Sequence, residues 1–269
     1  MARELRPLVR ELGLKKSSGD LRGRRRGGDL WTGRPGQQGS QSVPAAVATV
    51  GVGPRRAGDA TAALVDRLAP SWVVVTGIAG AIDARLQIGD VVEPDVVVDA
   101  RSGKRYLPHG ARSLRDRGES GRESGAPGDL TAPPPTAPAL VTVEGLGGAD
   151  SLPAELAAGA GVVDMETAAI AEVCETRGIP WNVIRAVSDR PGTLTTAITG
   201  LVDPHGRVRA GALVRLVITE PRQAIALARL GTDTRRAIAA STRTTRRRVD
   251  ELRIRLAARD HAAPPESAP

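Results

Sequence analysis

The sequence predicts an α/β fold, because apolar strands alternate with amphipathic helices along much of its length. The clearest unit is a helix at 58–68 (GDATAALVDRL), followed after Pro70 by a strand at 72–76 (WVVVT) and preceded by a strand at 45–52. This strand–helix–strand order indicates a parallel sheet. With 269 residues, 41% of them hydrophobic, the chain is long enough for one large α/β domain or two small ones.

The other elements follow from periodicity and turn residues. The remaining expected strands are 29–32, 91–98 with an interruption at Pro94, 139–143, a strand reaching 163, and 181–187. The remaining expected helices are 1–14, 152–158, one headed by Glu166, 210–219, 221–230 and a basic tail at 234–258. Turns are expected at 51–54, 77–80 and 87–90.

These elements predict an α/β domain over residues 1–230 and a basic helical extension over 231–269. Residues 100–138 are rich in Gly, Ser, Arg and Pro and poor in apolar residues, so a long mobile loop is expected there. A loop of this length in a compact domain is either functional or disordered.

The net charge of +8, from 38 Lys and Arg against 30 Asp and Glu, is compatible with a nucleic-acid partner. The arginines are scattered, however, apart from one run at 243–248, and rings for base stacking are scarce: the chain has three Trp, one Tyr and no Phe. A solvated basic surface is the preferred interpretation. Trp181 is expected to be a core residue.

Other functional classes lack their signals. No stretch approaches the roughly 20 consecutive apolar residues of a membrane span, and no signal-peptide apolar region opens the chain. The single Cys174 excludes an intrachain disulfide and suits a reducing, cytoplasmic compartment. The three histidines lack ligand spacing, so no metal and no cofactor are expected.

Two acids stand out in the segment 161–192 (GVVDMETAAIAEVCETRGIPWNVIRAVSDRPG). Glu166 falls on the apolar stripe of its helix, whereas Glu172 and Glu175 point the opposite way. An inward carboxylate requires hydrogen bonds or a ligand. Asp189 ends a strand, where α/β sheets bind ligands, although an Asp before a turn also serves as a cap. The pair suggests one shared small molecule.

The turn GVGPRRAG at 51–58 is a weaker candidate. It departs from the dinucleotide fingerprint because Arg56 replaces the third Gly, but backbone N–H groups before a helix suit an anion. A plain tight turn and a phosphate contact through Gly53 and Arg55 both remain open.

Four segments resemble the nucleoside phosphorylase and nucleosidase superfamily: VVDMETAAIAEVC, GIPWNVIRAVSD, WVVVTGIAGAI and LQIGDVV, which agree with it in order and spacing over residues 43–192. The resemblance implies a three-layer α/β fold with a twisted mixed sheet flanked by helices. It also implies a homo-oligomer that cleaves the N-glycosidic bond of a purine-type nucleoside or a related ribosylated metabolite.

The resemblance assigns roles to residues. Glu166 binds the ribose hydroxyls with Met165 packed against the sugar, and Asp189 protonates or holds the purine N7, assisted by Ser188. Gly77, Ile78, Ala79 and Gly80 border the substrate.

The start of the chain departs from the family pattern, which opens with an apolar strand before an A-M-x-x-E turn. Here the chain reads MARELRPL, so that strand is expected to be missing. Glu4 is the candidate for activating the attacking water, but the register equally places Arg3 at that position.

The attacking group remains open between water and inorganic phosphate, which a phosphorylase uses as co-substrate. Hydrolysis is favoured because Ile78 and Ala79 supply no side-chain donor. The alternatives are a catalytically impaired member that binds nucleoside-like ligands, and a basic nucleic-acid-binding protein that uses the C-terminal helix.

Overall fold

The computed structural model describes residues 5–17, 29–34, 43–109, 138–145, 152–190 and 221–262, with side chains of the last range described over 231–258. The chain forms two compact units, one of Met1–Gly51 together with Thr242–Pro269 and one of Val52–Ser241. This division differs from the expected boundary at residue 230. Residues from both ends of the chain share one unit.

The smaller unit contains α1 (Arg6–Glu11), β1 (Lys15–Lys16), β2 (Leu30–Gly33) and β3 (Ala45–Ala48). The three strands form an antiparallel sheet in the order β1-β2-β3. The apolar stripe predicted for the first helix is confirmed, because Leu8 and Leu12 are buried in a cluster with Leu14. Trp31 and Val47 pack against this cluster, so the unit has its own small core.

The expected parallel pairing of the strand at 45–52 is wrong. β3 pairs with β2 in antiparallel register, with Trp31 opposite Val47, and it does not join the sheet that contains the strand beginning near residue 72. A strand of a parallel sheet is normally buried on both faces. β3 is short and half-exposed to exposed along its length, which suits an antiparallel edge.

The larger unit contains the remaining elements. Its strands are β4 (Val73–Ala81), β5 (Val91–Val92), β6 (Val97–Asp99), β7 (Arg105–Tyr106), β8 (Ala139–Thr142), β9 (Ala160–Asp164) and β10 (Trp181–Asp189). Its helices are α2 (Pro54–Leu68), α3 (Ala154–Gly159), α4 (Thr167–Thr176) and the part of α6 (Pro221–Ala262) that precedes residue 242. Within the described residues, the strands form one seven-stranded mixed sheet in the order β5-β10-β4-β9-β8-β6-β7.

Two parallel groups of opposite direction meet in this sheet. β10 runs parallel to β4, while β9, β8 and β6 run parallel to one another. β4 and β9 pair antiparallel, with Gly80 opposite Val163. The carboxyl end of β9 therefore lies beside the second half of β4, and this junction is where the strand direction reverses.

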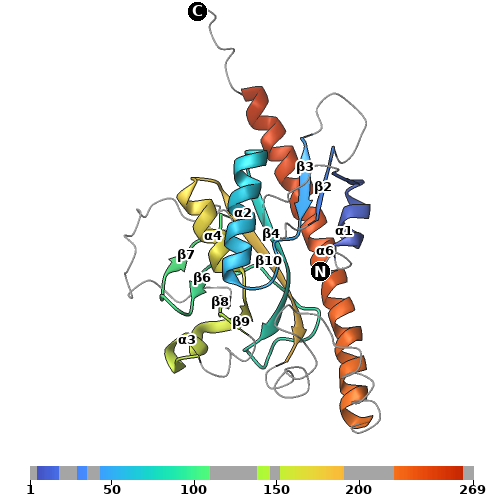
Figure 1. Cartoon of the computed structure of the whole chain (residues 1–269), viewed down its shortest axis with the longest axis vertical. Coiled ribbons are helices and arrows are strands. Elements are labelled where there is room, and N and C mark those ends of the chain that lie inside the picture. The colour runs from blue at the N-terminus through green and yellow to red at the C-terminus, as the bar shows by residue number, and fades with distance from the viewer. Residues whose placement is uncertain are drawn as a thin grey trace, which may run out of the picture. The chain divides into compact units, whose positions relative to one another are not determined.

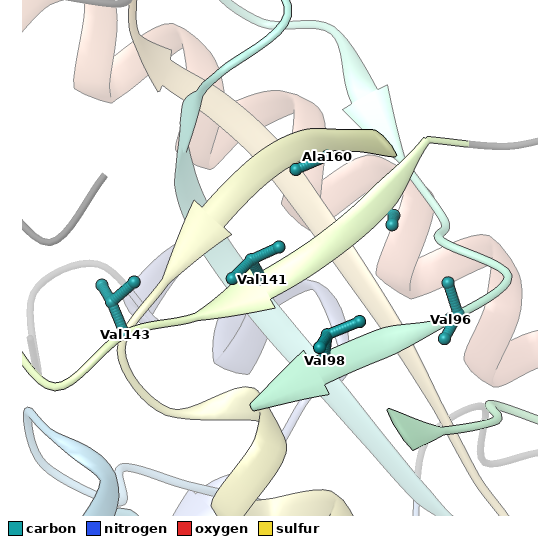
Figure 2. Close-up of a cluster of buried hydrophobic side chains, with 6 residues drawn as sticks. Val96, Val98, Val141, Val143 and Ala160 are labelled. Carbon is teal, nitrogen blue, oxygen red and sulfur yellow. The ribbon is translucent and has the colours of Figure 1, made fainter. Parts of the chain in front are cut away.

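The sheet is covered by helices on a core built of aliphatic residues. α2 and α4 pack side by side over the sheet, as Figure 1 shows, and Gly58 of α2 faces Ala169 of α4. Every residue of β10 is buried. A cluster of mainly valine side chains fills the region around β6, β8 and β9 (Figure 2): Val96, Val98, Ala139, Val141, Val143 and Ala160.

Three further expectations need revision. The turn predicted at 77–80 is part of β4. The helices predicted at 221–230 and 234–258 are one continuous helix, α6, because a single Gly among good helix formers costs only about 1 kcal/mol. The first residues of the expected loop at 100–138 form a hairpin in which Val97 of β6 pairs with Tyr106 of β7. The helix expected at 210–219 lies outside the described residues.

Gly161 is required by the packing of β9. A Cβ at this position would lie 2.1 Å from Cβ of Pro138, whose ring cannot move aside. We expect Gly161→Ala to destabilise the protein by roughly 1–3 kcal/mol, the usual cost of overpacking. The control is Gly58→Ala, whose Cβ would have an ordinary 3.7 Å contact inside a helix, and which should be neutral or slightly stabilising. Urea unfolding of both variants tests this, and equal midpoints would contradict it.

Candidate active site

Asp164, the last residue of β9, caps helix α4. Its carboxylate accepts hydrogen bonds from the Thr142 hydroxyl of β8 (2.7 Å) and from the Thr167 backbone N–H (3.1 Å), and it also accepts the Thr167 hydroxyl. The Thr142 hydroxyl oxygen in turn accepts the N–H of Ala168 (3.0 Å). The first N–H groups of α4, which have no partner within the helix, are therefore satisfied from β8 and β9.

Arg185 of β10 completes this network. Its Nη2 donates to Asp164 Oδ2 (2.5 Å) and to the Thr167 hydroxyl oxygen (2.7 Å). The Arg185 and Asp164 side chains are 6% and 1% exposed, so this is a fully buried ion pair. Such pairs need additional hydrogen bonds to offset the loss of hydration, and the two threonines supply them.

Glu166 occupies the N-cap position of α4, yet within the described residues its side chain makes no capping hydrogen bond. Instead its Oε1 accepts the backbone N–H of Gly53, at 2.9 Å, from the turn before α2. Burial raises the pKa of the Glu166 carboxyl, and the neighbouring Asp164 carboxylate raises it further, while the Gly53 N–H and Arg185 oppose the rise. Glu172 and Glu175 are exposed, as the helical pattern predicts.

Asp189 closes β10 and is buried. Its Oδ1 accepts the Ser188 hydroxyl (2.6 Å), which also lies within hydrogen-bond distance of the Ala79 carbonyl (3.3 Å). Burial raises the pKa of the Asp189 carboxyl, and the Ser188 hydrogen bond only partly opposes this rise. The group is thus favoured in its protonated form relative to a solvated Asp.

An irregularity in β10 changes the face of the sheet on which the Asp189 side chain lies. The register against β4 shifts between Val187 and Asp189, so that Asp189 pairs with Gly80. Arg185 lies against Gly77, whereas Asp189 lies on the Cβ side of Gly80. Since Gly77 and Gly80 are three residues apart and side chains alternate along a strand, the two β10 side chains lie on opposite faces of β4.

Gly77 and Gly80 of β4 allow side chains of β10 to approach the β4 backbone closely. This explains why the turn predicted over 77–80 is wrong. A Cβ at Gly77 would lie 2.3 Å from Arg185 Nη1, and one at Gly80 would lie 2.9 Å from Asp189 Oδ2. Bulky neighbours occupy the space that side chains would need. Glycine within a strand often marks a bulge, a tight bend or a close approach of this kind.

The other predicted residues have different surroundings. Ile78 packs against Ala186 and the α6 alanines Ala237 and Ala240. Met165 is half-buried against the valine cluster. Gly53 has a φ of +89° and gives its N–H to Glu166, and Arg55 is exposed. Glu4 lies outside the described residues.

Metal and membrane signals are weak in the described ranges. No group of His, Cys, Asp and Glu there is arranged to hold a metal ion, and no helix there is long and apolar enough to cross a bilayer. The side chains described near the end of β4 are carboxylates, a guanidinium and hydroxyls.

Comparison with known proteins identifies the family. The phosphorylase superfamily matches residues 1–143 and 152–219. The chain belongs to this superfamily.

Relatives agree with this assignment. A 5′-methylthioadenosine/S-adenosylhomocysteine nucleosidase of Geobacillus thermodenitrificans is 33% identical over 165 residues, covering 56% of this chain and 68% of the relative. The enzyme of the same name from Mycobacterium bovis is 28% identical over 186 residues, covering 54% and 69%.

Solved structures share the fold. One is the nucleosidase of that name from Neisseria meningitidis in complex with methylthio-immucillin-A, with a TM-score of 0.58, 20% identity, and 91% and 94% of the two chains covered. Another is futalosine hydrolase of Helicobacter pylori, with a TM-score of 0.59, 16% identity, and 93% and 94% covered. The predicted mixed-sheet fold and family are confirmed, and the chain is a superfamily enzyme that cleaves an N-glycosidic bond.

Sequence reasoning missed the Asp164–Arg185 network of this superfamily member. A signal was present, because Arg185 interrupts the apolar strand WNVIRAV and Asp164 ends the apolar run before Met165. A charged residue inside an apolar strand is rarely buried unless it is paired. The partner could not be read from the sequence, since it is 21 residues away on a strand that is not a neighbour of β10.

The raised pKa of Asp189 predicts a pH-dependent stability difference. When a carboxyl binds its proton more tightly in the folded than in the unfolded protein, the folded protein becomes less stable as the pH rises through the folded pKa of that carboxyl. We expect Asp189→Asn to match the wild type near the unfolded pKa of about 4 and to be more stable at neutral pH. Thermal unfolding between about pH 4 and 8 measures this difference. An Asn variant that is equally or less stable at pH 7 would contradict it.

Proposed function

We propose that this enzyme hydrolyses a purine nucleoside, with 5′-methylthioadenosine and S-adenosylhomocysteine as the substrates to test first. The observation that supports this most strongly is the placement of two acids on either side of β4: Asp189, buried at the end of β10, and Glu166, half-buried just beyond β9 and hydrogen-bonded to the Gly53 N–H.

Asp189 acts as the general acid in this proposal. Breaking the bond between C1′ and N9 leaves the electron pair on the purine and positive charge on the ribose. Proton transfer from Asp189 to N7 neutralises the departing base. Its raised pKa keeps the carboxyl protonated at a higher pH than a solvated Asp, and Ser188 fixes its orientation.

Glu166 holds the sugar. Its carboxylate accepts hydrogen bonds from the 2′- and 3′-hydroxyls, and its negative charge stabilises the oxocarbenium-like sugar of the transition state. The Gly53 N–H fixes one of its oxygens, and Met165, the adjacent residue, packs against the sugar in this proposal. Gly77, Ile78, Ala79 and Gly80 are proposed to border the substrate through their backbone.

Hydrolysis is preferred to phosphorolysis. The Gly53 N–H, a candidate phosphate donor, is engaged by Glu166, and Arg55 is exposed. Ile78 is packed into an alanine cluster and offers no donor. Glu4 is proposed to activate the water, with Arg3 as the alternative occupant of that position.

A homo-oligomer in the cytoplasm is proposed on the family resemblance and on the single cysteine, Cys174, which is buried as a free thiol. Burial raises the pKa of that thiol to about 12, so it stays protonated and unreactive.

The reaction is tested by mass analysis of the sugar product from 5′-methylthioadenosine, inosine and adenosine, with and without phosphate. Hydrolysis releases the free sugar, whereas phosphorolysis gives the sugar 1-phosphate. A phosphate-dependent product would contradict the proposed reaction, and binding without turnover would indicate an impaired member.

Asp189→Asn should lower kcat by roughly 10²- to 10⁴-fold while the fold is retained, because Asn cannot deliver the proton. The matched control is Asp83→Asn, a half-buried Asp paired with the exposed Arg85, which should leave kcat unchanged. Steady-state kinetics of both variants measures the effect. Wild-type turnover by the Asn variant would remove Asp189 from the mechanism.

A further inference from the structure

Two acids near the start of α4, Asp164 and Glu166, make different contacts. An acid at a helix N-terminus normally hydrogen-bonds the free N–H groups there. Here Asp164 makes that contact, to the Thr167 N–H, and Glu166 makes none within the described residues. The Glu166 carboxylate is directed to Gly53 instead. If Asp164 did not cap the helix, Glu166 would be the acid closest to those N–H groups.

Arg185 holds Asp164 in this position. Its Nη2 bridges Asp164 and Thr167, so the last residue of β9 and the first residue of α4 are tied to one guanidinium of β10. Glu166 lies in the turn between those two anchored residues. Gly77 leaves the space that the guanidinium occupies.

Stability alone is a poor explanation for the pair. Buried ion pairs often contribute nothing compared with apolar residues of similar volume, because both charges lose their hydration. A geometric role accounts better for keeping two charges here.

We propose that the Asp164–Arg185 pair is a positioning device for the ribose-binding carboxylate: it caps α4 in place of Glu166 and so keeps Glu166 turned toward Gly53 and the sugar. The inference rests on the proposed role of Glu166. Asp164 and Arg185 do not touch substrate in this proposal, and they act through Glu166.

The electrostatics are consistent with this arrangement. Asp164 raises the pKa of Glu166 and Arg185 lowers it, so the two charges act on Glu166 in opposite directions. Removing either member should therefore shift the Glu166 pKa with opposite sign.

The test uses Asp164→Asn and Arg185→Met, with Arg185→Lys as the conservative variant and Thr142→Val as a milder change that removes one donor to Asp164. Binding of 5′-methylthioadenosine and of free adenine is measured by calorimetry with Asp189→Asn as the parent protein, because that variant cleaves the nucleoside slowly. We expect Asp164→Asn to weaken nucleoside binding by roughly 10- to 100-fold, as a misplaced contact does, and to leave adenine binding within twofold. The same change on a Glu166→Gln background should have no further effect.

A second measurement does not depend on activity. The Gly53 amide donates to Glu166, so its hydrogen exchange should be faster in Asp164→Asn and Thr142→Val. Its chemical shift, followed against pH, should report a lower Glu166 pKa in Asp164→Asn and a higher one in Arg185→Met. The surface pair Arg177–Asp66 supplies the control, Asp66→Asn, which should alter none of these values.

The outcomes separate the two proposals. Equal loss of nucleoside and adenine binding, an undiminished effect on the Glu166→Gln background, or wild-type Gly53 exchange would overturn the positioning role. If the wild type binds no nucleoside, the proposed function fails, and the Gly53 exchange and titration still decide whether the pair positions Glu166.

Discussion

The buried ion pair between Asp164 and Arg185 is the interaction on which the arrangement of this active site depends. It joins the carboxyl end of β9 and the start of α4 to β10. In the sheet, β9 and β10 are separated by β4. Because both charges are fully buried and their donors come from β8, α4 and β10, the pair can form only when these elements are all in place. The local geometry of the site is therefore coupled to the assembly of the whole sheet.

β4 makes this coupling possible by having so little side-chain volume in its second half. Gly77 admits the Arg185 guanidinium and Gly80 admits the Asp189 carboxylate. The register shift before Asp189 places that acid across the strand from Arg185, which keeps the guanidinium away from the proposed acid. A regular β10 would put both side chains on one face, where the positive charge would lower the pKa of Asp189 and weaken it as a proton donor.

The local features of the fold could be predicted well from the sequence, whereas the pairing of distant strands could not. The stripe of α4 and the burial of the 181–187 strand follow from residue periodicity. The pairing of β3 with β2 does not, because a short apolar strand fits either kind of sheet. The turn predicted over Gly77–Gly80 is wrong because a strand glycine and a turn glycine look alike in sequence, and only the contacts with Arg185 and Asp189 distinguish them. The capping role of Asp164 could not be predicted from the sequence, because it depends on partners from three other elements.

The shortage of aromatic residues constrains how this enzyme recognises a base. Trp181 is fully buried at the start of β10, roughly 25 Å from Asp189 at about 3.3 Å per strand residue. Trp72 hydrogen-bonds Asn182 near that same distant end, Trp31 belongs to the smaller unit, and Tyr106 is buried in β7. The chain contains no Phe, and within the larger unit both Trp181 and Trp72 lie toward the end of β10 that is opposite Asp189. With these two rings remote from Asp189, the proposed role of this carboxyl includes a hydrogen bond that holds the purine as well as its protonation.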